Sequence, residues 1–385
     1  MFAERTNWGV GSNRLAALAE RLRGEHRAVL DLTETNPTRC GFRYFDQAPE
    51  AALAQFGVRA YAPDARGLPE TRAAISGYYR AQGAAVDPVR LLMTAGTSEG
   101  YSHLMRLLCN PGEALLVPSP SYPLLDLLAR VNDVRLIPYP LHHDGRWWLD
   151  VDALRAAADA TCRAIVVISP NNPTGSFLKD REREALVTLA RESGLAIIAD
   201  EVFADYRVAD TPDAAGTFAG EKRVLSFALN GVSKMLGLPQ MKLAWIVANG
   251  PEAQVAEACQ RLEVLADTYL SVGIPAQVAL PVWLARRAGV QAEILERLRE
   301  NFAVARTLRV AQCLPVEGGW CAVLRIPRTG TDEDFAVDLL QREGVLVDPG
   351  SLFDFANGGH VVVSLLAPPE IFAEGLRRLD AQAGL

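Results

Sequence analysis

Four short segments carry side chains of different chemistry, and they follow one another along the chain. Gly96-Thr97-Ser98 offers backbone N–H groups and hydroxyls, whereas Asn172 offers an amide; farther on, Asp200 supplies a carboxylate and Lys234 an amine. Each comes after an apolar run typical of a buried strand. An anion cradle, an amide donor, a carboxylate and a nucleophilic amine are the groups that bind and use pyridoxal phosphate (PLP). Together they predict a PLP site.

The first two segments also have structural interpretations. Gly96-Thr97-Ser98 stands between a predicted strand and a predicted helix, where free backbone N–H groups bind anions. Ser98 could equally serve only to cap that helix. Asn172 lies in a turn between Pro170 and Pro173, which restrict the backbone and would hold its amide as a fixed donor.

The carboxylate and the amine are predicted to be buried. Asp200 ends the apolar run Leu195–Ala199. A buried carboxylate without a partner is costly, so we expect Asp200 to have a cationic or hydrogen-bonding partner. The partner could be an arginine, or Asp200 could be a cofactor ligand that pairs with a protonated pyridine nitrogen. Lys234 follows another apolar strand in a glycine-flanked turn, which favours it over Lys222 and Lys242 as the reactive amine.

Two aromatic side chains are further candidates. Tyr122, in the segment Ser119–Pro123, offers a flat face on which a pyridine ring can stack, or it is a surface residue of a loop. Trp320 either shapes the pocket or belongs to the core.

Composition and charge exclude several classes of protein. The 385 residues are 49% hydrophobic and 22% charged, so two domains are expected. The net charge of −7 disfavours nucleic acid or an anionic membrane as a partner. No apolar run approaches the roughly 18 residues of a membrane span, and no secretory signal is recognised. The six cysteines form no CxxC pair and the histidines have no metal-ligand spacing. We therefore expect a cytoplasmic protein without a metal.

Short apolar runs alternate with amphipathic helical patterns from about residue 68, which is typical of an α/β fold with a mostly parallel sheet covered on both faces. Ligands bind such sheets beyond the carboxyl ends of the strands, where all four segments lie. A long helical region, about 251–311, leads to further strands near 321–326 and 360–366 and a closing helix near 369–381. The strands predicted for the large sheet are Leu91–Met93, Ala114–Val117, Val134–Ile137, Ala164–Ile168, Leu195–Ala199, Val224–Phe227 and Ala244–Val247.

Taken in order, these segments resemble the class I/II aminotransferases, which are PLP-dependent enzymes of fold type I. The resemblance extends from about Tyr61 to the C-terminus. It implies a large PLP-binding domain, 46–275, with a mostly parallel sheet of the seven-stranded type. It also implies a smaller α/β domain formed by the N-terminal arm, 1–45, and the C-terminal part, 276–385. The motifs that carry it are Thr94–Glu99, Ser119–Pro123, Asn171–Gly175, Asp200-Glu201 and Ser233-Lys234.

The resemblance implies a role for each candidate residue. Lys234 would carry the internal aldimine, a Schiff base, and move the proton between the substrate and the cofactor. Asp200 would pair with the pyridinium nitrogen, Asn172 would donate to the phenolic oxygen, and Tyr122 would stack on the ring.

The phosphate of the cofactor would be held by Thr97, Ser98 and Lys242. Tyr61 matches the family's tyrosine that reaches a phosphate across a dimer interface. The resemblance therefore implies a homodimer with shared active sites.

Several positions depart from the family pattern. Phe203 replaces a tyrosine that bonds the phenolic oxygen, so the phenolate should be more basic unless Tyr206 substitutes. Gly231 replaces a serine that binds phosphate. Lys242 replaces an arginine and can neutralise the phosphate only as a point charge. The segment 360–366 lacks the arginine that grips the substrate carboxylate.

Other residues are candidates for binding that carboxylate. Asn36, Arg39 and Arg43 lie where the family's N-terminal segment covers the substrate. We predict that one of these arginines, or Arg325, binds the carboxylate, or else that the substrate has no carboxylate there.

The implied function is amino-group transfer between an amino acid, or a related amine, and a 2-oxo acid through pyridoxamine phosphate. The alternative is a PLP-dependent lyase that cleaves C–S bonds or performs β-elimination or other carbanion chemistry, because the motifs do not determine the fate of the carbanion. A non-enzymatic regulator of the same fold is disfavoured because Lys234 is present and the chain is acidic.

Overall fold

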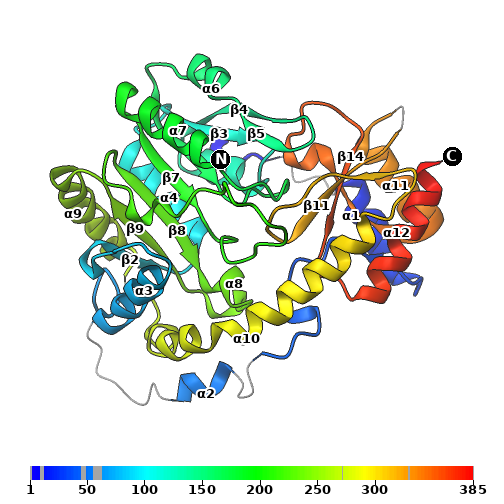
Figure 1. The fold of residues 1–385 in the computed structure, drawn as a ribbon, viewed down its shortest axis with the longest axis horizontal. Coiled ribbons are helices and arrows are strands. Elements are labelled where there is room, and N and C mark those ends of the chain that lie inside the picture. The colour runs from blue at the N-terminus through cyan, green and yellow to red at the C-terminus, as the bar shows by residue number, and fades with distance from the viewer. Residues whose placement is uncertain are drawn as a thin grey trace.

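A large mixed sheet is the main element of the computed structural model, which describes residues 2–8, 13–44, 49–54, 63–270, 272–327 and 330–384. The sheet has eight strands (Figure 1). β9 and β5 run antiparallel to their neighbours, and the other strands all run in one direction. The predicted, mostly parallel sheet is therefore confirmed, and β5 extends it by a hairpin that was not predicted. Across the sheet the order is β2 (Leu91–Thr94), β9 (Ala244–Asn249), β8 (Ser226–Gly231), β7 (Ala196–Asp200), β6 (Cys162–Ile168), β3 (Ala114–Ser119), β4 (Arg135–His143) and β5 (Trp147–Leu149).

Helices cover both faces of this sheet. Along β7, Ile197 and Ala199 pack in a cluster with residues of α7 (Asp180–Ser193). Ile198 points the other way, into a cluster with residues of α4 (Thr97–Leu108) and α9 (Glu252–Thr268). Successive strand residues face opposite sides, so a strand covered on both sides is apolar throughout. This explains the continuous apolar runs in the sequence. The other helices of this part are α2 (Pro49–Leu53), α3 (Pro69–Ala81), α5 (Leu124–Val131), α6 (Val151–Ala157) and α8 (Val232–Met235).

A second, smaller layer joins the two ends of the chain. β1 (Leu30–Asp31) pairs in parallel with β12 (Val345–Leu346). Through this pairing the N-terminal arm lies beside the C-terminal part, where we expect a smaller α/β domain. Beside it lies a four-stranded antiparallel sheet in the order β10 (Gln312–Cys313), β11 (Cys321–Arg325), β14 (His360–Ser364) and β13 (Asp348–Pro349). The helices of this layer are α1 (Arg14–Gly24), α11 (Asp332–Glu343) and α12 (Pro369–Ala383).

The long helical region predicted for 251–311 consists of two helices. α9 ends at Thr268, and α10 (Ile274–Ala305) begins after Gly273. α10 contacts both α3 and α12, so it runs from the large sheet to the smaller layer (Figure 1). The predicted boundary between 275 and 276 falls within its first turn.

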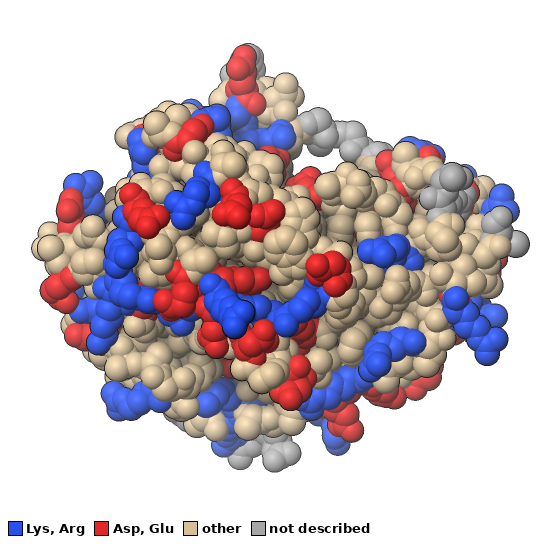
Figure 2. Space-filling model, turned by 45° about the horizontal axis from the view of Figure 1, so that its top comes forward, with Lys and Arg blue, Asp and Glu red and all other residues tan. Residues whose placement is uncertain are grey.

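The surface mixes charges of both signs. Figure 2 shows lysine and arginine side chains interspersed with aspartate and glutamate over the face turned to the viewer. All six cysteines are free thiols. Among the helices of the described ranges, none combines the length and the apolar character needed to cross a bilayer.

Candidate functional site

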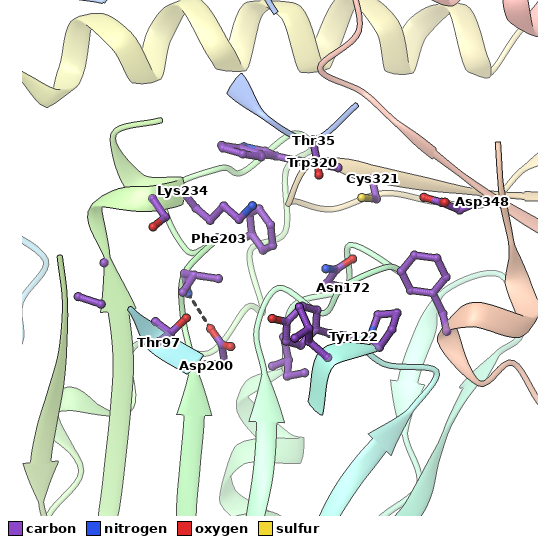
Figure 3. A pocket seen from close by; sticks show the side chains of 18 of the residues that line it. Thr35, Thr97, Tyr122, Asn172, Asp200, Phe203, Lys234, Trp320, Cys321 and Asp348 are labelled. Atoms are coloured by element: carbon purple, nitrogen blue, oxygen red, sulfur yellow. Dashed lines mark hydrogen bonds between the residues drawn. The ribbon is translucent and has the colours of Figure 1, made fainter. Parts of the chain in front are cut away.

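A cavity of about 390 Å³ lies between the strand ends of the large sheet and the smaller layer. The first wall is formed by residues at or just after the carboxyl ends of β2, β3, β6, β7 and β8, together with the start of β9. The second wall comes from the segment after β1, from β11 and from β13 (Figure 3). The cavity is thus at the edge where parallel sheets bind ligands. On the first wall it is lined by Thr97, Tyr122, Asn172, Asp200, Gly231 and Lys234, and on the second by Thr33, Thr35, Trp320, Cys321 and Asp348.

Lys234 presents a free amine to this cavity. Its Nζ lies 5.6 Å from the centre of the Phe203 ring and 5.0 Å from that of Trp320. Burial lowers the pKa of the Lys234 ammonium, and the nearby Cys321 and Asp200 only partly oppose this. A lysine in such surroundings is neutral more often than a solvated one and is therefore a better nucleophile and base.

Tyr206 holds the backbone that carries Lys234. Its hydroxyl donates to the carbonyl oxygen of Lys234 at 2.8 Å and to that of Met235 at 3.1 Å. The tyrosine is fully buried, and it does not line the cavity. Since its hydroxyl hydrogen is directed to the backbone, Tyr206 does not replace the hydroxyl that Phe203 lacks.

Asp200 is a buried carboxylate without a cation. It accepts hydrogen bonds from the Tyr101 hydroxyl at 3.1 Å and from the Val202 N–H at 3.2 Å. Burial raises the pKa of Asp200 to about 6, although these hydrogen bonds and the charge of Lys234 lower it in part. No arginine pairs with this carboxylate within the described residues. The arginine alternative therefore has no support here, and the carboxylate is available to a cationic ligand.

A positively charged recess lies at the start of α4. The helix begins at Thr97, which lines the cavity, and Gly96 precedes it. Lys242 lies against Gly96, since a methyl group built there would be 3.4 Å from Lys242 Nζ. This amine has no hydrogen bond or ion pair in the described part of the chain. Free N–H groups at a helix start and an unpaired ammonium suit a phosphate.

Gly231, at the end of β8, has no room for a side chain. A Cβ at this position would lie 2.7 Å from Ala244 Cβ and 3.0 Å from the Leu243 carbonyl oxygen. Because β9 approaches so closely, a serine cannot be accommodated here without a backbone shift. This is the physical reason for the departure at Gly231.

Tyr122 and Asn172 complete the first wall, and Ser98 lies behind Tyr122. The Tyr122 ring lines the cavity; burial raises the pKa of its hydroxyl, and a hydrogen bond with Ser98 lowers it in part. Ser98 itself is not among the lining residues. The Asn172 Oδ1 atom is buried without a partner, whereas the amide of Asn171 bonds to Pro120 and Thr174. Of the two asparagines, Asn172 is therefore the one free to meet a ligand.

The second wall contains residues that we did not predict as site residues. Thr33 and Thr35 follow β1, Cys321 begins β11, and Asp348 begins β13. Burial and, to a smaller extent, the charge of Asp31 raise the pKa of Asp348 to about 7. Trp320 belongs both to the pocket and to the core, since it lines the cavity and is 1% exposed.

The predicted substrate residues do not reach the cavity. Asn36 caps a short 3₁₀ helix by accepting from the N–H of Thr38. Arg39 and Arg43 are 74% and 92% exposed at their side chains, and they lie 3.7 Å from Glu34 and Glu293, respectively. Arg325 is also absent from the lining. Tyr61 lies outside the described residues.

Comparisons with known proteins agree with this geometry. A family model described as "Aminotransferase class I and II" matches residues 29–370. The glutamate-pyruvate aminotransferase AlaA of Haemophilus influenzae is 27% identical over 374 residues, 94% of this chain and 92% of that protein. The S-alkyl-thiohydroximate lyase SUR1 of Arabidopsis thaliana is 27% identical, over 83% of this chain and 71% of that protein. A crystal structure of an aminotransferase from Escherichia coli superposes with a TM-score of 0.89 at 25% identity, covering 100% and 98% of the two chains.

Proposed function

The chain belongs to the family of class I and II aminotransferases, and we propose that Lys234 is the amine with which it uses PLP to move an amino group from an amino donor to a 2-oxo acid. The observation that carries this assignment is the placement of unpaired groups around one cavity. Lys234 and Asp200 both face it, and neither forms an ion pair within the described ranges. Members of the family with this fold use PLP.

The residues present fit this cofactor. The Asp200 carboxylate would bind the protonated ring nitrogen, and the side-chain N–H of Asn172, which lines the cavity, would donate to the phenolic oxygen. The recess at Thr97 and Lys242 would hold the phosphate, with Ser98 beside it. When bound, PLP supplies an electron sink that stabilises negative charge at the α-carbon of the donor.

The chain's own residues would hold and move protons around this sink. Lys234, with its lowered pKa, would take the proton from the donor α-carbon as a neutral amine and return it as an ammonium. Phe203 and Trp320 enclose its Nζ and limit the access of water to it. Tyr122 would pack against the ring of the cofactor.

Three further assignments belong to this proposal. The substrates are a small-molecule amino donor and a 2-oxo acid acceptor. A homodimer is favoured by family membership, and in it Tyr61 would reach the phosphate of the partner's site. The six free thiols favour a reducing compartment such as the cytoplasm.

A half-reaction assay tests the proposal. The PLP-loaded protein is mixed with a panel of amino donors, and the absorbance change to pyridoxamine phosphate is followed together with 2-oxo acid release. Lys234→Ala is expected to slow this conversion by at least about 10³-fold because it removes the group that moves the proton. Lys222→Ala, at an exposed lysine, is the matched control and should react like the wild type. Conversion at the wild-type rate by Lys234→Ala would disprove the assignment.

The lyase is the second candidate, since one relative is named as a lyase. The same assay separates the two reactions. Transfer converts the protein stoichiometrically to the pyridoxamine form without ammonia, whereas β-elimination releases ammonia and leaves PLP in place. Sustained ammonia release without a 2-oxo acid acceptor would favour the lyase.

A further inference from the structure

The charged groups that line the cavity are divided unevenly between its walls. Lys234 and Asp200 lie on the first wall, where the proposed function assigns them to PLP. Asp348 is the charged residue of the second wall, and no arginine of the described residues lines the cavity. One carboxylate is thus left without a cofactor group to bind.

Asp348 has no partner among the residues that the structure describes. It begins β13 directly opposite Val362 of β14, which is buried in an apolar cluster with Val323 and Phe353. No hydrogen bond or ion pair to its carboxylate occurs in the part of the chain that the structure describes. A half-buried carboxylate without a cation is costly, and Asp348 is therefore a site that a ligand cation would complete.

The neighbouring carboxylate of Asp31 does not need such a cation. It accepts a hydrogen bond from Arg23 at 2.6 Å and another from the Thr33 hydroxyl at 2.7 Å. Its charge acts on Asp348 as a like charge. Because the described lining of the second wall contains the Asp348 carboxylate and no lysine or arginine, an anionic substrate group is disfavoured there and a cationic one is favoured.

Cys321 lies between Asp348 and the reactive amine. Cys321 and Asp348 both line the second wall, and the residue before Cys321 is Trp320, whose ring centre lies 5.0 Å from Lys234 Nζ. Figure 3 shows Lys234, Cys321 and Asp348 in this order along one side of the cavity. A donor whose reacting amine is at Lys234 can therefore direct its other end to Asp348.

We propose that Asp348 binds a second cationic group of the amino donor, so that the protein prefers diamines or diamino acids to donors with a neutral or acidic side chain. This specificity rests on the proposed aminotransferase function. An ammonium would form a charge-assisted hydrogen bond with the carboxylate. A carboxylate in the same place would face Asp348 with no guanidinium to bind it.

Paired donors test the specificity. L-Ornithine and L-norvaline have the same carbon chain and differ by the terminal ammonium, and L-glutamate is the acidic probe. For the wild type we expect kcat/KM of the half-reaction to be at least about tenfold higher with ornithine than with norvaline. Asp348→Asn should reduce this ratio to near one. Asp354→Asn, which removes an exposed carboxylate outside the lining, should keep it. A wild type that accepts norvaline or glutamate as well as ornithine would overturn the proposal, and so would an unchanged ratio in Asp348→Asn.

A binding measurement separates this inference from the proposed function. PLP-loaded Lys234→Ala is titrated calorimetrically with ornithine and with norvaline, so that no turnover is needed. Ornithine should bind about tenfold more tightly, and the difference should vanish in Lys234→Ala/Asp348→Asn. Equal binding of the two probes would overturn the role of Asp348 alone. If no donor formed pyridoxamine phosphate in the wild type, the proposed function would fail while the binding result still decided the role of Asp348.

Discussion

The two walls of the cavity are built in different ways. The first wall consists of strand ends in one rigid sheet, where the backbone fixes Asp200 and Gly231 by strand register and Thr97 by the start of a helix. The second wall is assembled from segments far apart in the sequence, with Thr33 after β1 and Asp348 at the start of β13. The first wall suits a cofactor common to many reactions, and the second suits a substrate. The contrast indicates that cofactor chemistry and donor choice are carried by separate parts of the molecule.

Among these tests, removing the Asp200 charge from the first wall should have the largest effect, and it should act on cofactor binding and on the reaction rate. Asp200→Asn keeps the shape of the side chain but cannot pair with a ring nitrogen, so we expect weaker PLP binding and a half-reaction slower by on the order of 10²-fold. Spectrophotometric titration with PLP and stopped-flow kinetics measure these effects. Asp205→Asn, at a half-buried carboxylate outside the lining, is the control and should bind PLP normally.

Asp200→Asn should also stabilise the apoprotein, which is the protein without PLP. Burial raises the pKa of Asp200 to about 6 from 3.8, so ionising it opposes folding; this cost is complete above pH 6 and disappears as the pH falls towards 3.8. At pH 8 the apoprotein of Asp200→Asn should gain up to about 3 kcal/mol in the free energy of unfolding, and at pH 4 the gain should nearly vanish. A loss of stability at pH 8 in denaturant unfolding would show that the buried carboxylate is satisfied without a ligand.

The second wall should impose a pH dependence on donor choice. The pKa of Asp348 in the free protein is raised to about 7. Below this pH the carboxyl group must lose its proton to bind a cation, so the ornithine-to-norvaline ratio should fall about tenfold per pH unit below 7 until the pKa of the complex is reached.

The other groups near Asp348 do not explain such a profile. The pKa of Cys321 is raised to about 12, so it stays a thiol, and Asp31 is bonded to Arg23. Because the ratio is taken at each pH, it cancels the titration of Lys234, which both donors share. Asp348→Asn should give a flat ratio, and a flat ratio in the wild type would remove Asp348 from substrate selection.

The next test concerns the close contact between β8 and β9 in the first wall. Gly231→Ala should lower the free energy of unfolding by about 1–3 kcal/mol because its methyl group meets Ala244. Ala244→Gly in the same chain should recover much of this loss. If Gly231→Ala alone proves neutral in denaturant unfolding, the two strands are less closely packed than described.

The smallest effect is expected at Phe203. Phe203→Tyr adds a hydroxyl near the phenolic oxygen of PLP. In a pH titration of the bound cofactor followed by absorbance, the pKa should fall by about one unit. Phe203→Leu adds no donor and should not lower it. An unchanged titration in Phe203→Tyr would mean that the ring edge does not reach the cofactor.

The difference between the walls also explains how far the sequence could be interpreted. Strand ends are recognisable, because the apolar run before Asp200 and the glycine-flanked turn at Lys234 are local patterns. Thr33 follows β1 and Asp348 begins β13. Both strands have only two residues, so they have no periodicity to detect. Their meeting depends on the pairing of β1 with β12, across more than three hundred residues.

The prediction that arginines of the N-terminal segment reach the substrate failed for a similar reason. Arg39 and Arg43 are in the segment that covers the cavity, but Thr33 and Thr35 are the residues of that segment that line it. The direction of a loop after a short strand is set by tertiary contacts such as the hydrogen bond from the Ser364 hydroxyl to the Glu34 carbonyl oxygen. No local pattern encodes that direction.

Peptide mapping after borohydride reduction tests the central assignment most directly. The chain has only four lysines, at positions 179, 222, 234 and 242. Reduction of the PLP-loaded protein fixes the cofactor to the amine that it occupies, and digestion followed by mass spectrometry identifies that residue. We predict that Lys234 carries the label and that the other three lysines remain unmodified. Label on Lys242, or on Lys179 beside Glu317, with none on Lys234 would contradict the account.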